Sequence, residues 1–255
     1  MRVNRCLGLW RGALAAALFI GVSAATSHAA TIAYWNNNSN GLPNGGLFGY
    51  APGDFPQAAD VGTGTLNLAM FETATEVDAS GNTKYVSIES FAGSTVNAQG
   101  GDPAGGSLSP EGGTSDGSGG FLNNGMKILY TIPTTGYEDI KISWAQRGTS
   151  SGFTSRALAY STDGGSIFTP VAFTGDTGVL SSTYGLVSID LSAVSALDNL
   201  PSVIFQVTLS GATSSNGNNR FDNMLFEGTA IPEPTTLALA GLGMIAAGTV
   251  RRRAR

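Results

Sequence analysis

The chain has 255 residues, of which 36 are glycine and 12% are charged, and its formal net charge is −5. Its single cysteine and single histidine, Cys6 and His28, both lie close to the N-terminus. The remainder of the chain therefore excludes disulfides, cysteine nucleophiles, Ser-His-Asp triads, and zinc or haem sites built on His or Cys.

The N-terminal segment has the three parts of a secretory signal. Arg2, Arg5 and Arg11 precede an apolar, alanine-rich run over residues 12–25, and the stretch Ser27-His28-Ala29 ends in small residues. A charged region, a short apolar region and small residues at the cleavage site characterise signal peptides, whereas a stable membrane span needs a longer apolar run. We expect signal peptidase to cleave after Ala29, so that the mature chain begins at Ala30 and residues 1–29 are removed.

Period-two alternation of apolar residues predicts strands through residues 30–230. The most regular sets are 126–132, 139–144 and 203–209, where every second residue is apolar. Such spacing places one set on the core face of a sheet and the other set outward. Less regular candidates are 31–35, 65–71, 84–91, 155–161, 167–173, 186–191 and 221–227. About ten short strands separated by turn signals predict an all-β fold, a β-sandwich of jelly-roll type.

Three segments between the strands predict other local structure. The run Asp163-Gly164-Gly165 predicts a tight hairpin, because glycine adopts positive φ without steric cost. Residues 192–199 are the one stretch that reads as a helical turn. The glycine-rich segment 98–120 holds nine glycines and almost no apolar side chain, so we expect it to be an irregular loop.

The charge of the middle segment restricts its partners. Between Ala30 and Ile231 the chain holds six basic and seventeen acidic residues, which gives a formal charge of −11; seven arginines and Glu233 in the two ends account for the difference from the whole chain. An acidic exterior argues against nucleic acid and against anionic membrane surfaces as partners.

The C-terminal tail contains a short apolar segment between a proline-containing tripeptide and a run of basic residues. It begins with Pro232-Glu233-Pro234, continues without charge from Thr235 to Val250, and ends in a basic run. Two prolines keep the tripeptide extended and open to a protease. The apolar segment, about 24 Å long as a helix, predicts a marginal transmembrane helix. The basic residues, expected to remain on the cytoplasmic side, are Arg251, Arg252, Arg253 and Arg255.

This tail closely resembles the PEP-CTERM sorting signal of bacterial exported proteins, over residues 231–255. The resemblance implies that an exosortase-type membrane protease recognises Pro232, Glu233 and Pro234 and processes the tail nearby. Two further stretches, 148–165 and 218–223, resemble secreted PEP-CTERM proteins whose middle domain is a jelly-roll or concanavalin-like sandwich. The expected partners are thus the export machinery, signal peptidase and an exosortase, and the expected location is the cell surface or the extracellular space after transient anchoring.

Three functions fit these observations. The first is a structural or adhesive role at the surface or in the extracellular matrix, with exopolysaccharide as a possible partner. The second is a carbohydrate-binding module; the aromatic residues available for it are Tyr34, Trp35, Tyr137, Trp144 and Tyr184. The third is a glycoside hydrolase built on two carboxylates. Its candidates are Glu72, Glu76, Glu89, Glu138 and Asp139. We favour the first and expect no enzyme, because acidic side chains in such a protein are usually solvated.

Two further kinds of ligand site have candidate residues. Arg147 and Arg156 flank a Gly/Ser/Thr loop and could bind the carboxylate of a ligand through bidentate hydrogen bonds. The favoured interpretation is that both form ion pairs with nearby acidic side chains at the surface. Calcium is possible at Asp102, Glu111 and Asp116, but their spacing matches no calcium loop. A metal role for Asp222 and its neighbouring asparagines has little support, and no metal is predicted.

Overall fold

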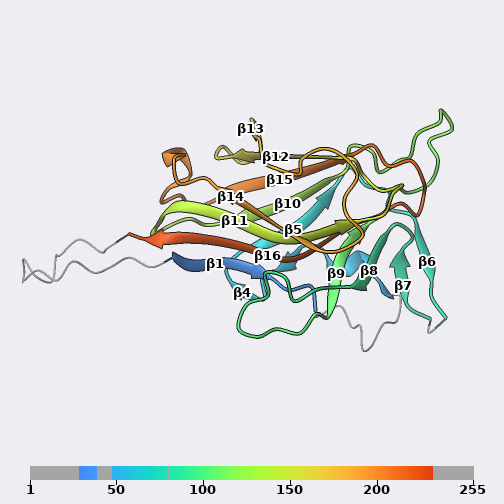
Figure 1. The fold of residues 1–255 in the computed structure, drawn as a ribbon, viewed down its shortest axis with the longest axis horizontal. Helices are drawn as coiled ribbons and strands as arrows, with labels where there is room; N and C mark the ends of the chain where they lie inside the picture. Colours follow the sequence, from blue (N-terminus) through green and yellow to red (C-terminus); the bar gives the residue numbers. More distant parts are fainter. Residues whose placement is uncertain (1–28, 39–47, 80, 232–255) are drawn as a thin grey trace, which may run out of the picture.

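A computed structural model describes residues 29–38, 48–79 and 81–231. Within these ranges the chain forms two sheets stacked face to face and a small two-stranded ribbon (Figure 1). The fold is an all-β sandwich of jelly-roll type, as the period-two pattern predicts.

The eight-stranded sheet has the order β14-β11-β16-β9-β8-β2, and β1 joins it by pairing with β16 and β4. Its strands are β1 (Ala29–Trp35), β2 (Phe48–Gly49), β4 (Val61–Gly62), β8 (Ile88–Ala92), β9 (Gly106–Pro110), β11 (Tyr137–Gly148), β14 (Gly185–Asp190) and β16 (Asn219–Ala230). The long strand β16 is central because it pairs with β11 on one side and with both β1 and β9 on the other.

The six-stranded sheet has the order β13-β12-β15-β10-β5-β3. Its strands are β3 (Gln57–Ala58), β5 (Thr65–Ala69), β10 (Lys127–Ile132), β12 (Ser155–Ser161), β13 (Thr169–Val171) and β15 (Val203–Ser210). The separate ribbon consists of β6 (Thr75–Val77) and β7 (Thr83–Tyr85), and two short 3-10 turns are η1 (Pro52–Asp54) and η2 (Ser195–Leu197).

Aromatic side chains from both sheets meet in the core. Trp35 of β1 packs edge-on against Tyr130 of β10, with ring centroids 5.2 Å apart. Phe226 of β16 lies 5.5 Å from Tyr130 and 5.2 Å from Phe205 of β15. All four side chains are essentially fully buried, so burial of their large apolar surfaces stabilises the contact between the sheets.

Most predicted strands are confirmed with small changes in their ends. The segment 155–161 is β12 itself, whereas the predicted strand 84–91 is split between β7 and β8. The helical turn predicted at 192–199 is η2, and the hairpin turn at Asp163 is also confirmed. Asp163 Oδ1 accepts the amides of Ser166 and Ile167 at 3.0 Å each, and Gly164 and Gly165 have positive φ.

The prediction of an irregular loop over 98–120 is wrong in part. Residues 106–110 form β9, which lies between β8 and β16 in the eight-stranded sheet. Leu108 is fully buried opposite Phe221, while the small side chains of Ser107 and Ser109 face the other way and are also buried. Small residues fit here because the outer face of β9 is covered, so composition alone gave a false indication of a loop.

Candidate functional site

The start of β1 and the end of β16 lie at the same end of the sandwich. Antiparallel pairing of β1 with β16 places Ala29 opposite Thr229 and Ala30 opposite Gly228 (Figure 1). Ile231, which directly precedes the Pro-Glu-Pro sequence, donates its amide to the Gly136 carbonyl at 2.9 Å. The folded domain therefore begins and ends in one pair of strands.

The sorting residues themselves lie outside the described residues. These are Pro232, Glu233 and Pro234, with the basic residues Arg251, Arg252, Arg253 and Arg255, and the predicted signal peptide up to His28. Within residues 29–38, 48–79 and 81–231, no helix is long and apolar enough to cross a membrane.

The aromatic residues proposed as a sugar platform are mostly internal. Trp35 and Trp144 belong to the core, and Tyr34 is fully buried with its hydroxyl donating to Asn223 Oδ1 at 2.7 Å. Tyr137 packs against the core at the start of β11. Tyr184 is the only one of the five that lies partly exposed on the outer face of the eight-stranded sheet, which we define as the face turned away from the core.

The outer face carries two arginines on neighbouring strands. Arg147 of β11 and Arg220 of β16 are direct partners in the antiparallel register. Because Phe221 points into the core, its neighbour Arg220 points outward, and Arg147 shares that side. The Arg147 guanidinium lies 5.7 Å from the centre of the Tyr184 ring, and that of Arg220 lies 4.3 Å from the centre of the Phe91 ring.

Two buried glutamates stand beside these arginines. Glu89 of β8 is opposite Ser109 of β9, and Glu111 follows β9; both residues are buried. Burial, with a smaller contribution from the charge of Glu89, raises the pKa of Glu111 to about 7. Lys84 Nζ lies 3.0 Å from Glu89 Oε1 and 3.3 Å from Glu76 Oε1. Two of the carboxylates proposed for catalysis therefore form ion pairs with the same lysine.

The other proposed carboxylates lie in different places. Glu72 accepts the amide of Thr114 at 2.8 Å and lines a small pocket of about 120 Å³ together with Glu111. Glu138 and Asp139 are on β11 near the end of the sandwich where β16 ends. The structure therefore gathers Glu76, Glu89 and Glu111 in one area and leaves Glu138 and Asp139 apart from them.

Arg156 is a structural residue, and its predicted pairing with surface acids is wrong. The side chain is fully buried, and its guanidinium donates to the carbonyls of Phe153, Gly175 and Gly178 at 2.6–3.0 Å. These bonds tie the loop after β13 to the start of β12. Sequence spacing alone could not separate Arg156 from Arg147, since both alternate with small residues.

The three proposed calcium ligands do not converge on one another. The Asp102 carboxylate accepts a hydrogen bond from Asn36 Nδ2 at 3.1 Å. Asp116 accepts hydrogen bonds from the backbone amides of Ser118 and Gly120 within its own turn. Glu111 lies beside Glu89. No group of three or more acidic, histidine or cysteine side chains in the described part of the chain could hold a metal ion.

Asp222 and Asn223 instead organise the segment that crosses the outer face. Asp222 Oδ2 accepts the Ser94 amide at 2.6 Å, and Asn223 Nδ2 donates to the carbonyls of Ser94 and Val96 at 2.7 and 2.8 Å. Asn223 has φ 51°, at an irregularity in the pairing of β16 with β11. This bulge turns both polar side chains toward residues 94–96.

Asp222 is fully buried, and within the described residues no basic side chain lies at ion-pair distance from it. Burial raises the pKa of its carboxyl to about 8, against the opposing effect of hydrogen bonds from the backbone amides of Ser94 and Asn223 and from the Asn37 side chain. The carbonyls of Ala104 and Gly106 approach the same point beside Gly93. A side chain at position 93 would collide with these two carbonyls and with the Asp222 carboxyl, so glycine is needed where this segment crosses β16.

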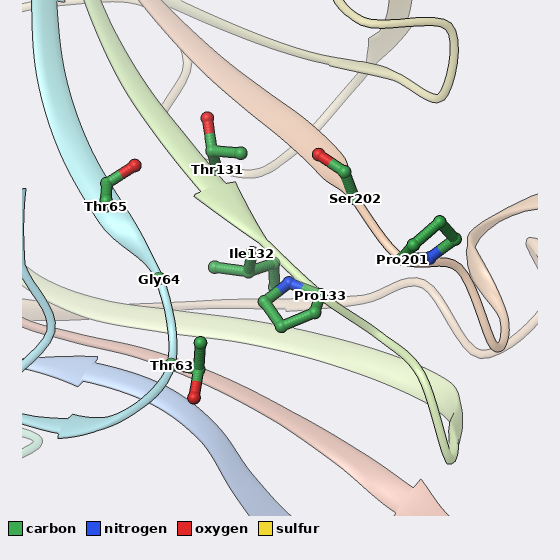
Figure 2. Close-up of a pocket in the computed structure, with 8 residues that line it drawn as sticks. All are labelled: Thr63, Gly64, Thr65, Thr131, Ile132, Pro133, Pro201 and Ser202. Carbon is green, nitrogen blue, oxygen red and sulfur yellow. The ribbon is translucent and has the colours of Figure 1, made fainter.

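A pocket of about 430 Å³ opens beside the turn that leads into β5, the end of β10 and the start of β15. Figure 2 shows its lining, which consists of Thr63, Gly64, Thr65, Thr131, Ile132, Pro133, Pro201 and Ser202. Hydroxyl groups are the only side-chain polar groups of this lining, and it has neither a charge nor an aromatic ring. It therefore offers no strong means of selecting a ligand.

Comparison with known proteins identifies the C-terminal signal. The model of the PEP-CTERM protein-sorting motif matches residues 230–253. The chain is thus a β-sandwich protein that carries a PEP-CTERM sorting signal, which indicates export and handling by an exosortase. No curated protein matches the sequence.

Several solved structures are similar to the chain at low identity. The K3 cleaved adhesin domain of Lys-gingipain from Porphyromonas gingivalis matches with a TM-score of 0.38 and 8% identity, over 78% of this chain and 99% of that one. The TmCBM61 module, solved with β-1,4-galactotriose, gives 0.34 and 8% over 76% and 97%. The xylan-binding module CBM15 gives 0.34 and 15% over 50% and 93%.

Proposed function

We propose that the exported domain serves as a structural or adhesive component of the cell surface or the extracellular matrix. The observation that carries this proposal is the sorting signal, which begins where β16 ends. A protein delivered to a membrane protease in this way is anchored only briefly and then acts outside the cell.

The arrangement of the domain supports display at the surface. Because β1 starts and β16 ends at the same end of the sandwich, a chain held by its tail leaves the rest of the domain free to contact other material. The formal charge of −11 in the middle segment favours solubility and disfavours adsorption to anionic lipid.

An adhesive role fits the side chains better than catalysis or sugar stacking does. Glu76 and Glu89 are both engaged with Lys84, so they are poorly placed to act as a free acid and base. Three of the five aromatic residues considered for a sugar platform are fully buried in the folded domain. We therefore include no enzymatic activity in the proposal.

The test is to locate the protein in a host that has an exosortase. Antibody labelling of intact cells and of the isolated matrix should detect the domain, and deletion of residues 232–255 should change how much of it stays with the cells. A matched host without exosortase is the control. Detection solely inside the cells, with or without exosortase, would show that the protein has no surface role.

A further inference from the structure

The basic residues of the domain differ sharply in whether they have partners. Lys84 and Lys141 form ion pairs, with Glu76 and Glu89 and with Asp190 respectively, and Arg156 is saturated by carbonyls. Arg147 and Arg220 have no carboxylate within 4.0 Å in the described ranges of the chain. In a segment of net charge −11, two adjacent arginines without an acidic partner need an explanation.

The two guanidinium groups lie close together and face the same way. They occupy directly opposed positions of β11 and β16, and burial, with a smaller contribution from the charge of Arg147, lowers the pKa of Arg220. Like charges at opposed positions destabilise a pair of strands. An anion bound between them would remove this repulsion.

The surroundings leave hydrogen-bond donors of both groups available. Arg147 Nε has no hydrogen-bond partner but is itself buried, and the Arg220 side chain makes a long bond of 3.4 Å from Nε to Asn218 Oδ1 and a further bond to Tyr184. The donors that remain for a ligand are terminal N–H groups of the two guanidinium groups. Each guanidinium rests on an aromatic ring, Arg147 on Tyr184 and Arg220 on Phe91. Contact with a ring face restricts the side chain while leaving its in-plane N–H groups free to bind a carboxylate.

We propose that Arg147 and Arg220 form a binding site for the carboxylate of an acidic polysaccharide. The inference deepens the adhesive role proposed above and rests on it for its biological setting. Arg–carboxylate pairing is frequently bidentate, and two guanidinium groups side by side can hold both carboxylate oxygens. The hydroxyl of Tyr184 donates to the Ala92 carbonyl at 2.9 Å and is also hydrogen-bonded to Arg220, which fixes this ring beside the two guanidinium groups.

The charge around the pair selects for isolated carboxylates over dense polyanions. Glu89 and Glu111 lie on the same outer face, and Glu111 is close enough to Arg220 to affect its pKa. Double-stranded DNA carries about one negative charge per 1.7 Å of its axis and would bring several phosphates against these carboxylates, whereas a uronic acid polymer carries a single carboxylate on each sugar ring. Acidic polysaccharide is therefore the occupant that the site favours.

The experiment measures binding of the full chain, solubilised in a mild detergent, to polygalacturonate. We expect binding at low salt that weakens when the salt is raised to about 0.5 M, because the site is partly exposed. Arg147→Ala and Arg220→Ala should each lower affinity about tenfold or more, as expected for a lost charge-assisted interaction. The same polymer with its carboxylates reduced to alcohols should not bind.

Matched controls separate the site from general charge effects. Lys127→Ala removes one positive charge from β10 of the opposite sheet and should leave affinity unchanged. Arg147→Lys and Arg220→Lys keep the positive charge but lose the planar guanidinium that can donate two parallel hydrogen bonds to one carboxylate. These variants should bind the polymer less tightly than wild type. Thermal melts of all variants show whether the fold is kept.

Three outcomes would overturn the inference. They are equal binding by the correctly folded double alanine variant, equal binding of the reduced polymer, and equal or tighter binding of double-stranded DNA. Because the assay uses purified protein, it is independent of location, so a failure of surface display and a failure of this site are recognised separately.

Discussion

Ala29 and Thr229 are partners across antiparallel strands, so the predicted signal cleavage position lies beside the last residues before the sorting motif. One pair of strands, β1 and β16, thus connects the two positions at which the chain is expected to be processed. Signal peptidase acts on extended chain, so we infer that β1 takes its place in the sheet after export.

Replacing Arg156 with alanine should destabilise the domain by about 3 kcal/mol or more. The guanidinium is fully buried and satisfies three carbonyls, which would be left without donors. Denaturant unfolding of the variant and of Lys127→Ala, the charge-matched control, measures the difference. Equal midpoints for the two variants would show that the Arg156 bonds contribute little.

Asp222 should make the stability of the domain fall as the pH rises. Its pKa is about 8 in the folded protein and about 4 in an unfolded chain, so the folded state holds the proton more tightly. The contribution of Asp222 to the free energy of unfolding is greatest below about pH 4. It is lost as the pH rises from about 4 to about 8, by at most about 1.4 kcal/mol per pH unit. Asp222→Asn should flatten this dependence in unfolding experiments.

Asn223→Ala should loosen the segment around residues 94–97. Its side chain accepts the Tyr34 hydroxyl and donates to the carbonyls of Ser94 and Val96, and alanine supplies none of these bonds. The positive φ of 51° is also less favourable for alanine. Hydrogen exchange should quicken at these residues while the β10–β15 pairing keeps its protection; a uniform change would indicate global destabilisation instead.

The sequence predicted the strands better than it predicted the polar residues between them. Strict alternation identified β10, β11 and β15 because each buries alternate apolar side chains in one core. It missed β9, since Gly106, Ser107 and Ser109 are small and their burial depends on neighbours far away in the sequence. Tertiary packing decided that segment.

The candidate site was predictable only in part for the same reason. Arg147 was noted from its local setting, but its partner Arg220 is 73 positions later and is brought opposite it by the register of β11 and β16. Asp222-Asn223 was recognisable as a pair, whereas its contacts with Ser94 and Val96 depend on the bulge. Spacing along the chain carries no information on such pairings.

Two changes in the tail should separate recognition from retention. Replacing Pro232 and Pro234 with alanine should leave the apolar segment in place but impair recognition, so that unprocessed protein accumulates in the membrane fraction. Removing Arg251–Arg253 should instead weaken the cytoplasmic stop. Fractionation blots from an exosortase host compare the two; processing of the proline variant like wild type would mean that the tail is a plain anchor.

Mass spectrometry of the termini of the exported protein tests the central claim most directly, because it reports both processing events in one molecule. The account predicts an N-terminus at Ala30 or a close neighbour and a C-terminus near Pro232–Pro234, which would confine the product to the folded domain between β1 and β16. Exported protein that still begins at Met1 or still ends at Arg255 would contradict it.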